Sequence, residues 1–338
     1  MATIPISKCS EAVFRQRFAR LLGWATLVAI ASLACMESAS AHVVAEFHQT
    51  LAVSAIEPVT LDIEIARGEV QVLYSRDGQV SITGFAQASS SGLNSNYFKA
   101  VLTVEQNGNH LKIRHVSNPV YLEEGINVLY RIDVPYRTVV TSKVDNGRQT
   151  ISGVMGPVKV VTRKGDIKAS YLSKGLQAEV ETGNLDLEVI GEHVEAKTGK
   201  GNISCTRLAQ GVTAETEEGD IALMVVGPST ATVKSGTGRI EAGGVRGTFF
   251  ASTSAGDLHV QAVPHDDWQL TSASGNVRFE LPPAARFDLD ASTNSGELQI
   301  NRDDIARPLS DVRHFHQQVN GGGKRIQAHT GSGRIVIG

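Results

Sequence analysis

The sequence predicts an all-β protein, a right-handed parallel β-solenoid (β-helix) with coils of about 18 residues, on three observations. A motif of type T-x-x-G-D/N-I returns from mid-chain to the last residues, and its glycines lie 18 or 19 residues apart up to Gly275. Short runs of alternating small apolar residues surround each motif, and aromatic residues make up 5% of the chain. So regular a period is typical of a repeat architecture. The clearest copies are TRKGDI at 162–167, TGKGNI at 198–203, TEEGDI at 216–221, SGTGRI at 235–240, TSAGDL at 253–258, TNSGEL at 293–298 and TGSGRI at 330–335.

The chemistry of one repeat explains these residue types. Runs such as 158–161 and 166–169 alternate and place apolar side chains on one face of an extended strand. The glycine between two runs adopts a positive φ, and the following Asp or Asn caps the turn through its side chain. One repeat is too short to enclose a core. Stacked repeats satisfy each other's backbone groups and form a continuous, narrow interior.

Residues 1–41 have the pattern of a secretory signal peptide. Four basic residues precede an apolar run from Leu21 to about Ala34, and Ala39-Ser40-Ala41 matches the small-residue cleavage pattern. We therefore expect the mature chain to begin at His42, with no transmembrane segment after removal of the signal. Two alternatives remain open, an uncleaved membrane anchor and a lipoprotein attached through Cys35.

Residues 42–140 are predicted to form a β-rich N-terminal cap or a set of irregular coils. The segment lacks the strict turn motif, and residues 106–109 predict a hairpin turn. No stretch shows a helical period, so we expect no helix in the mature chain. A cap would cover the open sheet edge of the first coil. The strand-like runs are 59–65, 69–73, 79–83, 100–105, 111–115 and 128–134.

Residues 141–338 are predicted to hold the solenoid repeats, with a loop insertion near 301–316. The spacing from Gly296 to Gly333 is 37 residues, about two periods. This interval is interpreted as one irregular coil with a protruding loop, closed by the final strands. The loop is the best candidate for a binding site, although an ordinary surface insertion also fits. Its candidate binding residues are Arg302, Asp303, Asp304, Arg313, His314 and His316.

Charge and cysteine content narrow the classes of partner. The whole chain carries −3 and the leader +2, so the mature part carries about −3 − 2 = −5. No basic patch points to nucleic acid or to an anionic membrane surface. Cys205 is the one cysteine outside the leader, and its place in the alternation predicts a buried thiol rather than a reactive one.

The motifs favour a protein without catalytic residues, cofactors or metal ions. The adjacent acidic pairs are scattered along the chain, and Gly-x-Ser-x-Gly is absent. Asp166, Asp220 and Asp257 follow turn glycines and would align as a calcium column, but Arg239 and Arg334 occupy the same position, so turn capping is the better account. His314 and His316 would share one strand face as metal ligands, without an identifiable third ligand.

The leader, the strand-rich start, Ile132-Asp133-Val134-Pro135 before the repeats and the terminal GGGKRIQAHTGSGRIVIG together resemble the bacterial putative-adhesin family of unknown function. The resemblance covers nearly all of residues 43–338 and brings no catalytic residues. It implies an exported, non-catalytic β-solenoid of the periplasm or cell surface that binds an envelope polymer, a surface or a protein partner. The alternatives are a structural or stress-regulatory envelope module with a protein partner and, less favoured, a polysaccharide lyase or hydrolase.

Overall fold

The computed structural model describes residues 42–88, 96–116, 126–306 and 312–338. The chain divides into two units, Met1–His42 and Val43–Gly338, and the fold described below is that of the second. The expected cleavage site at Ala39 and Ala41 and the alternative lipid attachment at Cys35 lie outside the described residues. Among the described helices, none has the length and apolar character needed to cross a membrane.

The Val43–Gly338 unit is built from two sheets, each with 14 strands in the described residues. In spatial order, sheet A contains β1 (His42–Ala52), β4 (Gln79–Ala88), β7 (Ile126–Val134), β3 (Glu69–Tyr74), β9 (Gln149–Ser152), β11 (Ile167–Leu172), β13 (Leu185–Ile190), β15 (Ile203–Leu208), β17 (Ile221–Val226), β19 (Ile240–Val245), β21 (Leu258–Gln261), β23 (Val277–Glu280), β28 (Arg334–Ile337) and β25 (Glu297–Ile300).

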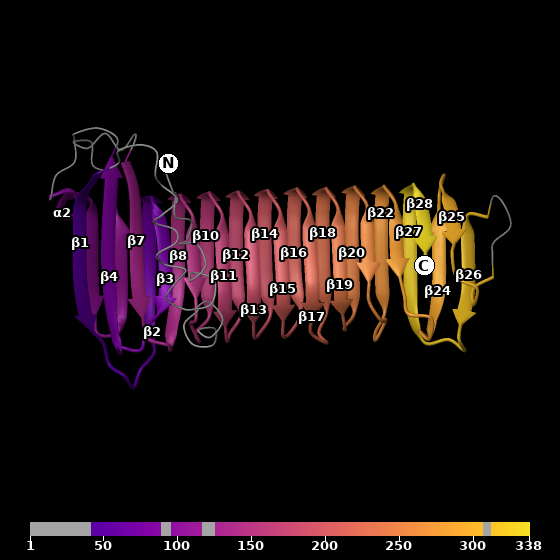
Figure 1. The fold of residues 1–338 in the computed structure, drawn as a ribbon, viewed down its shortest axis with the longest axis horizontal. Coiled ribbons are helices and arrows are strands. Elements are labelled where there is room, and N and C mark those ends of the chain that lie inside the picture. The colour runs from indigo at the N-terminus through magenta and orange to yellow at the C-terminus, as the bar shows by residue number, and fades with distance from the viewer. Residues whose placement is uncertain (1–41, 89–95, 117–125, 307–311) are drawn as a thin grey trace, which may run out of the picture. The chain divides into compact units, whose positions relative to one another are not determined.

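Sheet B extends along the same stack (Figure 1). From the C-terminal end of the stack to its N-terminal end, it contains β26 (His314–Val319), β24 (Phe287–Thr293), β27 (Lys324–Ser332), β22 (Trp268–Ser274), β20 (Phe249–Ala255), β18 (Ala231–Thr237), β16 (Val212–Glu218), β14 (Val194–Lys200), β12 (Leu176–Thr182), β10 (Val158–Lys164), β8 (Thr138–Asn146), β2 (Val59–Arg67), β6 (His110–His115) and β5 (Leu102–Asn107).

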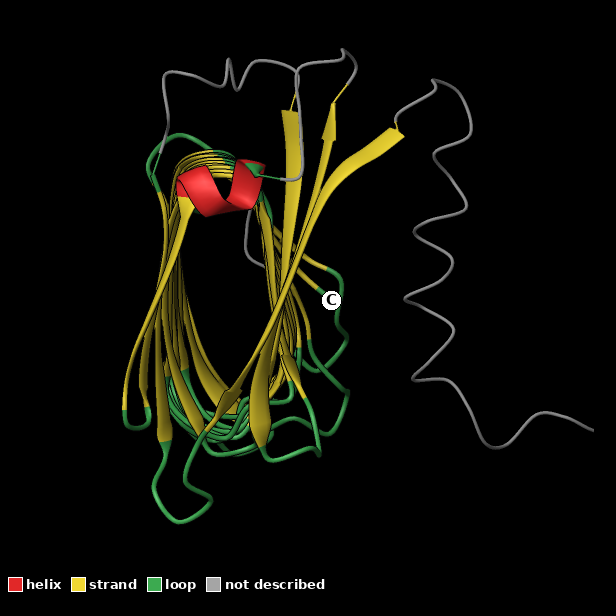
Figure 2. Cartoon of the chain, turned by 90° about the vertical axis from the view of Figure 1, so that its left-hand side faces the viewer, coloured by secondary structure: helices red, strands yellow, loops and turns green. Residues whose placement is uncertain are grey.

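Each coil of the central stack consists of one sheet B strand, a glycine turn, one sheet A strand and a second corner. Successive strands pair in parallel with a shift of one repeat, as in Val158 with Leu176 and Ile167 with Leu185. Viewed along the stack, the two sheets face each other (Figure 2). The predicted parallel β-solenoid with 18-residue coils is confirmed.

The core is a narrow set of columns between the two sheets. Val160, Ala178, Ala196 and Ala214 occupy one column and are buried. Small side chains suit this position because consecutive strands are only about 4.8 Å apart and the sheets lie close together. Cys205 lies in the facing column and is fully buried, as predicted. Burial raises the pKa of its thiol to about 12.

The turn motif forms two hydrogen-bonded ladders. The hydroxyl of Thr198 donates to the carbonyl oxygen of Gly183 in the preceding coil, over 2.9 Å. On the other side of the turn, the Asp166 carboxylate accepts the backbone N–H of Asn184, also over 2.9 Å. The expected capping role of the Asp or Asn is therefore confirmed, with the cap reaching the next coil. Bonds of the same kind recur in later coils, from Thr216, Ser235, Thr253, Ser272 and Thr330 and to Asn184, Asn202, Asp220, Asp257 and Asn276.

At the N-terminal end, parallel coils continue beyond the strict motif. β2 pairs in parallel with both β8 and β6, and β3 does so with β9 and β7. β4 is antiparallel to β7 and β5 is antiparallel to β6, and the predicted hairpin turn joins β5 to β6. These antiparallel strands end the parallel coils at this side of the stack.

The expectation that the mature chain lacks helix is wrong. A single turn, α2 (Tyr97–Val101), lies across one end of the space between the sheets (Figure 2). It buries Tyr97, Phe98 and Val101. Five residues are too few to display a helical period in the sequence, and tertiary burial of this apolar face stabilises the turn instead.

The C-terminal end also departs from the prediction of one irregular coil closed by the final strands. β27 and β28 do not follow β24 and β25 in the stack. β27 lies between β22 and β24, and β28 lies between β23 and β25. The last coil in sequence is thus the penultimate coil in space. β26 then forms the edge of sheet B, antiparallel to β24.

Candidate binding surface

A groove of about 820 Å³ lies on the outer face of sheet B. It crosses six consecutive strands, from β8 to β18. With strands about 4.8 Å apart, five spacings give a length of about 24 Å. Its charged lining residues are the basic Lys143, Arg163, Lys197 and Lys234 and the acidic Asp145, Glu179, Glu181, Glu215 and Glu217.

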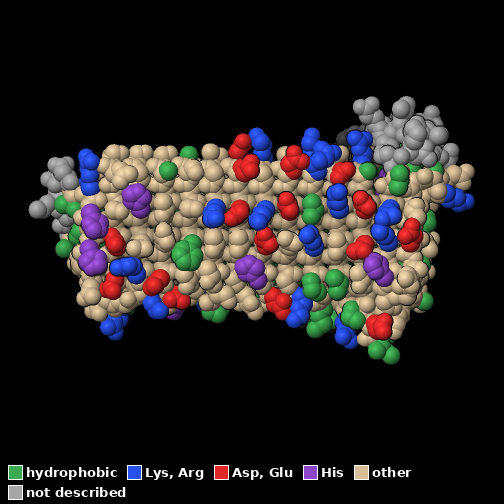
Figure 3. Space-filling view, turned by 180° about the vertical axis from the view of Figure 1, so that it is seen from behind, with side chains coloured by type: hydrophobic (Ala, Val, Ile, Leu, Met, Phe, Trp, Pro, Cys, Tyr) green, Lys and Arg blue, Asp and Glu red, His purple; other side chains and the backbone are tan. Residues whose placement is uncertain are grey.

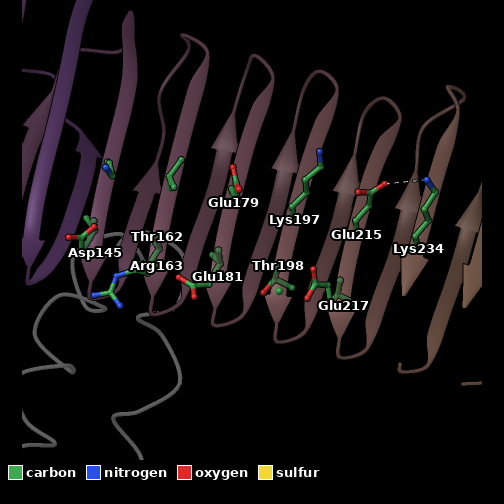
Figure 4. A pocket seen from close by; sticks show the side chains of 16 residues that line it. Asp145, Thr162, Arg163, Glu179, Glu181, Lys197, Thr198, Glu215, Glu217 and Lys234 are labelled. Atoms are coloured by element: carbon green, nitrogen blue, oxygen red, sulfur yellow. Dashed lines mark ion pairs between the residues drawn. The ribbon is translucent and has the colours of Figure 1, made fainter. Parts of the chain in front are cut away.

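The central row of the groove alternates in charge from strand to strand. Parallel register places Glu179 beside Lys197 and Lys197 beside Glu215. Lys234 completes this row, with its ammonium nitrogen 3.4 Å from a Glu215 oxygen (Figure 4). Outward side chains repeat once per coil because the coils have nearly the same length. The sequence period thus becomes a row of charges across the sheet.

A second row lies two residues further along each strand. It carries Asp145, Arg163, Glu181 and Glu217, with Gly199 between the last two (Figure 4). A Cβ at Gly199 would lie 2.6 Å from the carbonyl oxygen of Glu181, so a larger residue at this position would force the local backbone to shift. The missing side chain also leaves the groove open between two carboxylates.

An ion pair between Lys197 and Glu195 lies at the edge of the groove. Lys197 donates to Glu195 over 2.7 Å. This hydrogen bond holds the pKa of Glu195 below its usual range and raises the pKa of Lys197. Both side chains are well exposed, so water and salt screen the interaction. The groove therefore presents fixed donors and acceptors of both signs instead of a field of one sign.

The row of alternating charges covers only part of this face. Figure 3 shows one row of alternating basic and acidic side chains over the N-terminal coils, and few charges between this row and the C-terminal edge. The intervening outward positions on β20, β22 and β27 include Phe250, Ser252, Gln269, Thr271, Gln327 and His329, and β27 begins with the exposed Lys324 and Arg325. Phe250 is 42% exposed.

Arg302 and Asp304, two of the candidate loop residues, form an ion pair at the C-terminal end of the stack, in which Arg302 is buried and Asp304 is exposed. The guanidinium of Arg302 donates to the carbonyl oxygens of Leu281 and Pro282 over 2.8 and 3.1 Å, and it pairs with both oxygens of Asp304. Arg302 is 8% exposed. Asp303 between them is exposed. The predicted loop thus begins with a structural clamp, and its residues 307–311 lie outside the described part.

The other three candidates lie on or beside β26. Arg313 donates to the carbonyl oxygen of Asn294, and the imidazole of His314 lies 2.9 Å from a carboxylate oxygen of Asp290. His316 is in register with the same Asp290, so both imidazoles occupy the outer face as predicted. Among the described residues, no three His, Cys, Asp or Glu side chains are grouped in a way that would hold a metal ion.

The groove residues are visible in the sequence, but they do not stand out there as a site. Lys143, Glu179, Lys197 and Glu215 recur at multiples of 18 residues, and alternation places them outward. The same pattern describes any solvated strand face. The distinguishing signal is the alternation of charge at that period, together with a glycine at 199.

Comparison with known proteins finds similar solved structures of low sequence identity. Three of them are a putative cell adhesion protein from Clostridium sporogenes ATCC 15579 (13% identity, 86% of this chain and 98% of that one, TM-score 0.23), a putative adhesin from Bacteroides fragilis NCTC 9343 (12%, 86% and 95%, 0.32) and a putative adhesin from Parabacteroides distasonis ATCC 8503 (8%, 87% and 99%, 0.28).

No curated protein matches the sequence. The model of one family, described as Toastrack DUF4097, matches residues 59–338, which confirms the resemblance to a family of unknown function found in the sequence. The chain belongs to the Toastrack DUF4097 family.

Proposed function

We propose that this protein is an exported, non-catalytic, adhesin-like binding protein of the bacterial envelope, and that it binds an extended glycan along the sheet B groove. The observation that carries the proposal is the groove itself, which crosses six coils with a repeating set of donors and acceptors. An extended chain lying across the strands would meet anionic and cationic side chains in alternation, one strand every ~4.8 Å. Support for export comes from the leader sequence.

The alternation of charge favours a glycan without a strong charge of one sign. A polyanion would be attracted by Lys197 but repelled by Glu179 and Glu215. A polycation would be attracted by the two glutamates but repelled by Lys197. Sugar hydroxyls both donate and accept hydrogen bonds, so they suit a surface that offers both signs.

Catalysis is the less favoured alternative. A general acid in polysaccharide hydrolysis needs a carboxyl group with a raised pKa. At the edge of the groove, the pKa of Glu195 is lowered by its hydrogen bond with Lys197. This direction makes Glu195 unsuited to the role of general acid.

The test is binding of the full chain to an array of neutral and acidic glycans, with product analysis for every hit. Lys197→Glu should weaken binding of the groove ligand about tenfold or more, since a charged donor becomes a like charge beside Glu215. The matched control is Lys168→Glu on the outer face of sheet A, where Lys168 lies 3.1 Å from Asp186. The control should leave binding unchanged.

Three outcomes would overturn the proposal. The first is a wild-type protein that binds no glycan on the array, and the second is an equal effect of the two substitutions. The third is turnover of a bound glycan, which would identify an enzyme. Thermal melts of both variants should match the wild type, because exposed ion pairs contribute only about 0–1 kcal/mol.

A further inference from the structure

A second, smaller pocket of about 300 Å³ lies at the glycine corner of sheet A, over the coils of β19, β21, β23 and β28. Three arginines from three different coils line it, Arg239, Arg278 and Arg334, together with His259, Asp257 and Asn276. The chain as a whole carries −3, so a local excess of guanidinium groups is unusual for this molecule. The pocket is separate from the sheet B groove and shares no lining residue with it.

Two of these arginines break the turn chemistry of the solenoid. In the preceding coils, an Asp or Asn after the glycine accepts the N–H of the next coil, as Asn202 does from Asp220 over 2.8 Å. Arg239 and Arg334 occupy this position, and a guanidinium has no acceptor. The ladder is interrupted at Arg239. A residue that replaces the capping Asp or Asn without restoring its hydrogen bond often has a functional role.

The stacking order places the arginines around one space. Arg239, Asp257, Asn276 and Arg334 follow one another in the same column, so the two arginines flank the pocket three coils apart. At about 4.8 Å per coil their Cα atoms are about 14 Å apart, within the combined reach of two long side chains around a small ligand. Arg278 enters from the neighbouring outward row on β23.

The arginines differ in how far they are engaged. Arg278 donates to Glu280 over 2.8 Å, and Arg334 donates to Glu297 over 3.1 Å. Both glutamates lie outside the pocket lining. Arg239 is exposed, and among the described residues it has no carboxylate partner within 4 Å. Its guanidinium is therefore available to a ligand.

Asp257 is the single acidic residue that lines the pocket. One of its oxygens accepts both the backbone N–H and the side-chain amide of Asn276, over 2.7 and 3.2 Å. The negative charge of Asp257 repels an anion, so removal of this charge tests whether the pocket binds one. Asn at this position would keep the accepting oxygen and remove the charge.

We propose that this pocket binds an oxyanion group, the carboxylate or sulfate of an acidic sugar residue. Guanidinium groups bind such planar or tetrahedral anions through paired N–H donors. Three arginines in one pocket suit a single acidic group and lack the extended basic track that a nucleic acid backbone requires. The site is independent of the groove and does not rest on the function proposed above.

The experiment is calorimetric titration of the full chain with trigalacturonate, with neutral trigalactose and with inorganic sulfate. Trigalacturonate should bind more tightly than trigalactose, whose hydroxyl groups are a ligand for the groove and not for this pocket, and salt should weaken the binding of trigalacturonate. Arg239→Gln should weaken it about tenfold or more, since it removes a charged donor. Asp257→Asn should strengthen it, because a nearby like charge is removed. The control is Arg76→Gln, an exposed arginine in the turn between β3 and β4 that lines neither the groove nor this pocket, and it should have no effect.

Saturable competition by sulfate would show that the oxyanion is the recognised group. Equal affinity for trigalacturonate and trigalactose would overturn the proposal, as would wild-type affinity in Arg239→Gln. An equal loss of affinity in Arg76→Gln would show an effect of net charge alone and overturn this site as well. Unchanged circular dichroism spectra and melts for each exposed substitution keep these outcomes separate from misfolding.

Discussion

The hydroxyl of Thr198 donates to the carbonyl oxygen of Gly183, one coil earlier, over 2.9 Å. Thr198 is 4% exposed, so this bond lies in the dry interior of the turn. It explains why the motif requires Thr or Ser three residues before glycine. An apolar side chain of the same shape would fill the space and leave the carbonyl oxygen without this donor.

Thr198→Val should therefore lower the free energy of unfolding by about 1–2 kcal/mol, the cost of an unsatisfied buried acceptor. The measurement is the urea midpoint followed by circular dichroism. Thr232→Val, an outward position on β18, is the matched control and should change the midpoint little. Equal losses in the two variants would show that strand propensity and not the ladder bond is the cause.

The turn glycine that ends this motif, Gly201, is required for two reasons that can be separated by experiment. Gly201 has a φ of +148°, and a Cβ there would lie 2.0 Å from the carbonyl oxygen of Gly183. Gly78 has a φ of +64°, and a Cβ there would meet no atom within 4 Å. The first position thus combines backbone strain with a clash between coils.

Gly78→Ala should cost about 1–2 kcal/mol, the penalty of a left-handed residue with a Cβ. Gly201→Ala should cost more than this, because the stacked coils must also move apart. Comparison of the two denaturation midpoints checks the difference. If both substitutions cost the same, the close approach contributes nothing and the dihedral angle alone selects glycine.

Parts of this fold could be predicted from the sequence because their signals are local and repeated. The turn glycines, the inward column of Ala178 and Ala196 and the burial of Cys205 all follow from one period. The insertion of β27 and β28 between earlier coils could not be predicted, since Gly333 carries the same motif whichever coil it stacks upon. The burial of Arg302 could not be predicted either, because the sequence does not distinguish a buried arginine that forms a clamp from one in a surface loop.

A second column of left-handed residues runs along the other side of sheet A, and no sequence motif predicts it. Tyr171, Val189 and Arg207 have φ values of 55°, 53° and 56°, and they lie 18 residues apart. Val189 is the most strained of the three, since a β-branched residue resists this region. The geometry of the coil imposes this strain, because Gly153 and Gly244, at the ends of the column, also have a positive φ.

Val189→Asn should raise the free energy of unfolding by up to about 1 kcal/mol, because Asn tolerates the left-handed region and the side chain is only half-buried. The control is Val161→Asn, an equally half-buried valine in the extended strand β10, where the change should be destabilising. The urea midpoints of both variants, compared with the wild type, measure these changes in stability. A loss of stability at both positions would mean that packing of Val189 outweighs its backbone strain.

The clamp between Arg302 and Asp304 should make the C-terminal coil sensitive to acid. The hydrogen bond from Arg302 holds the pKa of Asp304 below its usual range, against an opposing effect of burial. A carboxyl with a lowered pKa in the folded state contributes stability above its unfolded pKa, about 3.9, and this contribution is lost as pH falls through the folded value. Asp304→Asn should therefore be less stable than the wild type at pH 7.

The difference between the two proteins should shrink as pH falls below about 4 and vanish once Asp304 is protonated. The stability difference is measured from the urea midpoints of both proteins between about pH 7 and about pH 2. Because both proteins are compared at the same pH, the titration of the other carboxyl groups cancels. In a protein that already carries Arg302→Gln, adding Asp304→Asn should change the stability by the same amount at every pH. The reason is that the charged donor that lowers the pKa of Asp304 is gone. A difference that persists unchanged at the acid end of this range would mean that Asp304 stabilises the coil by shape and hydrogen bonding alone, and that its charge has no part in closing the end of the solenoid.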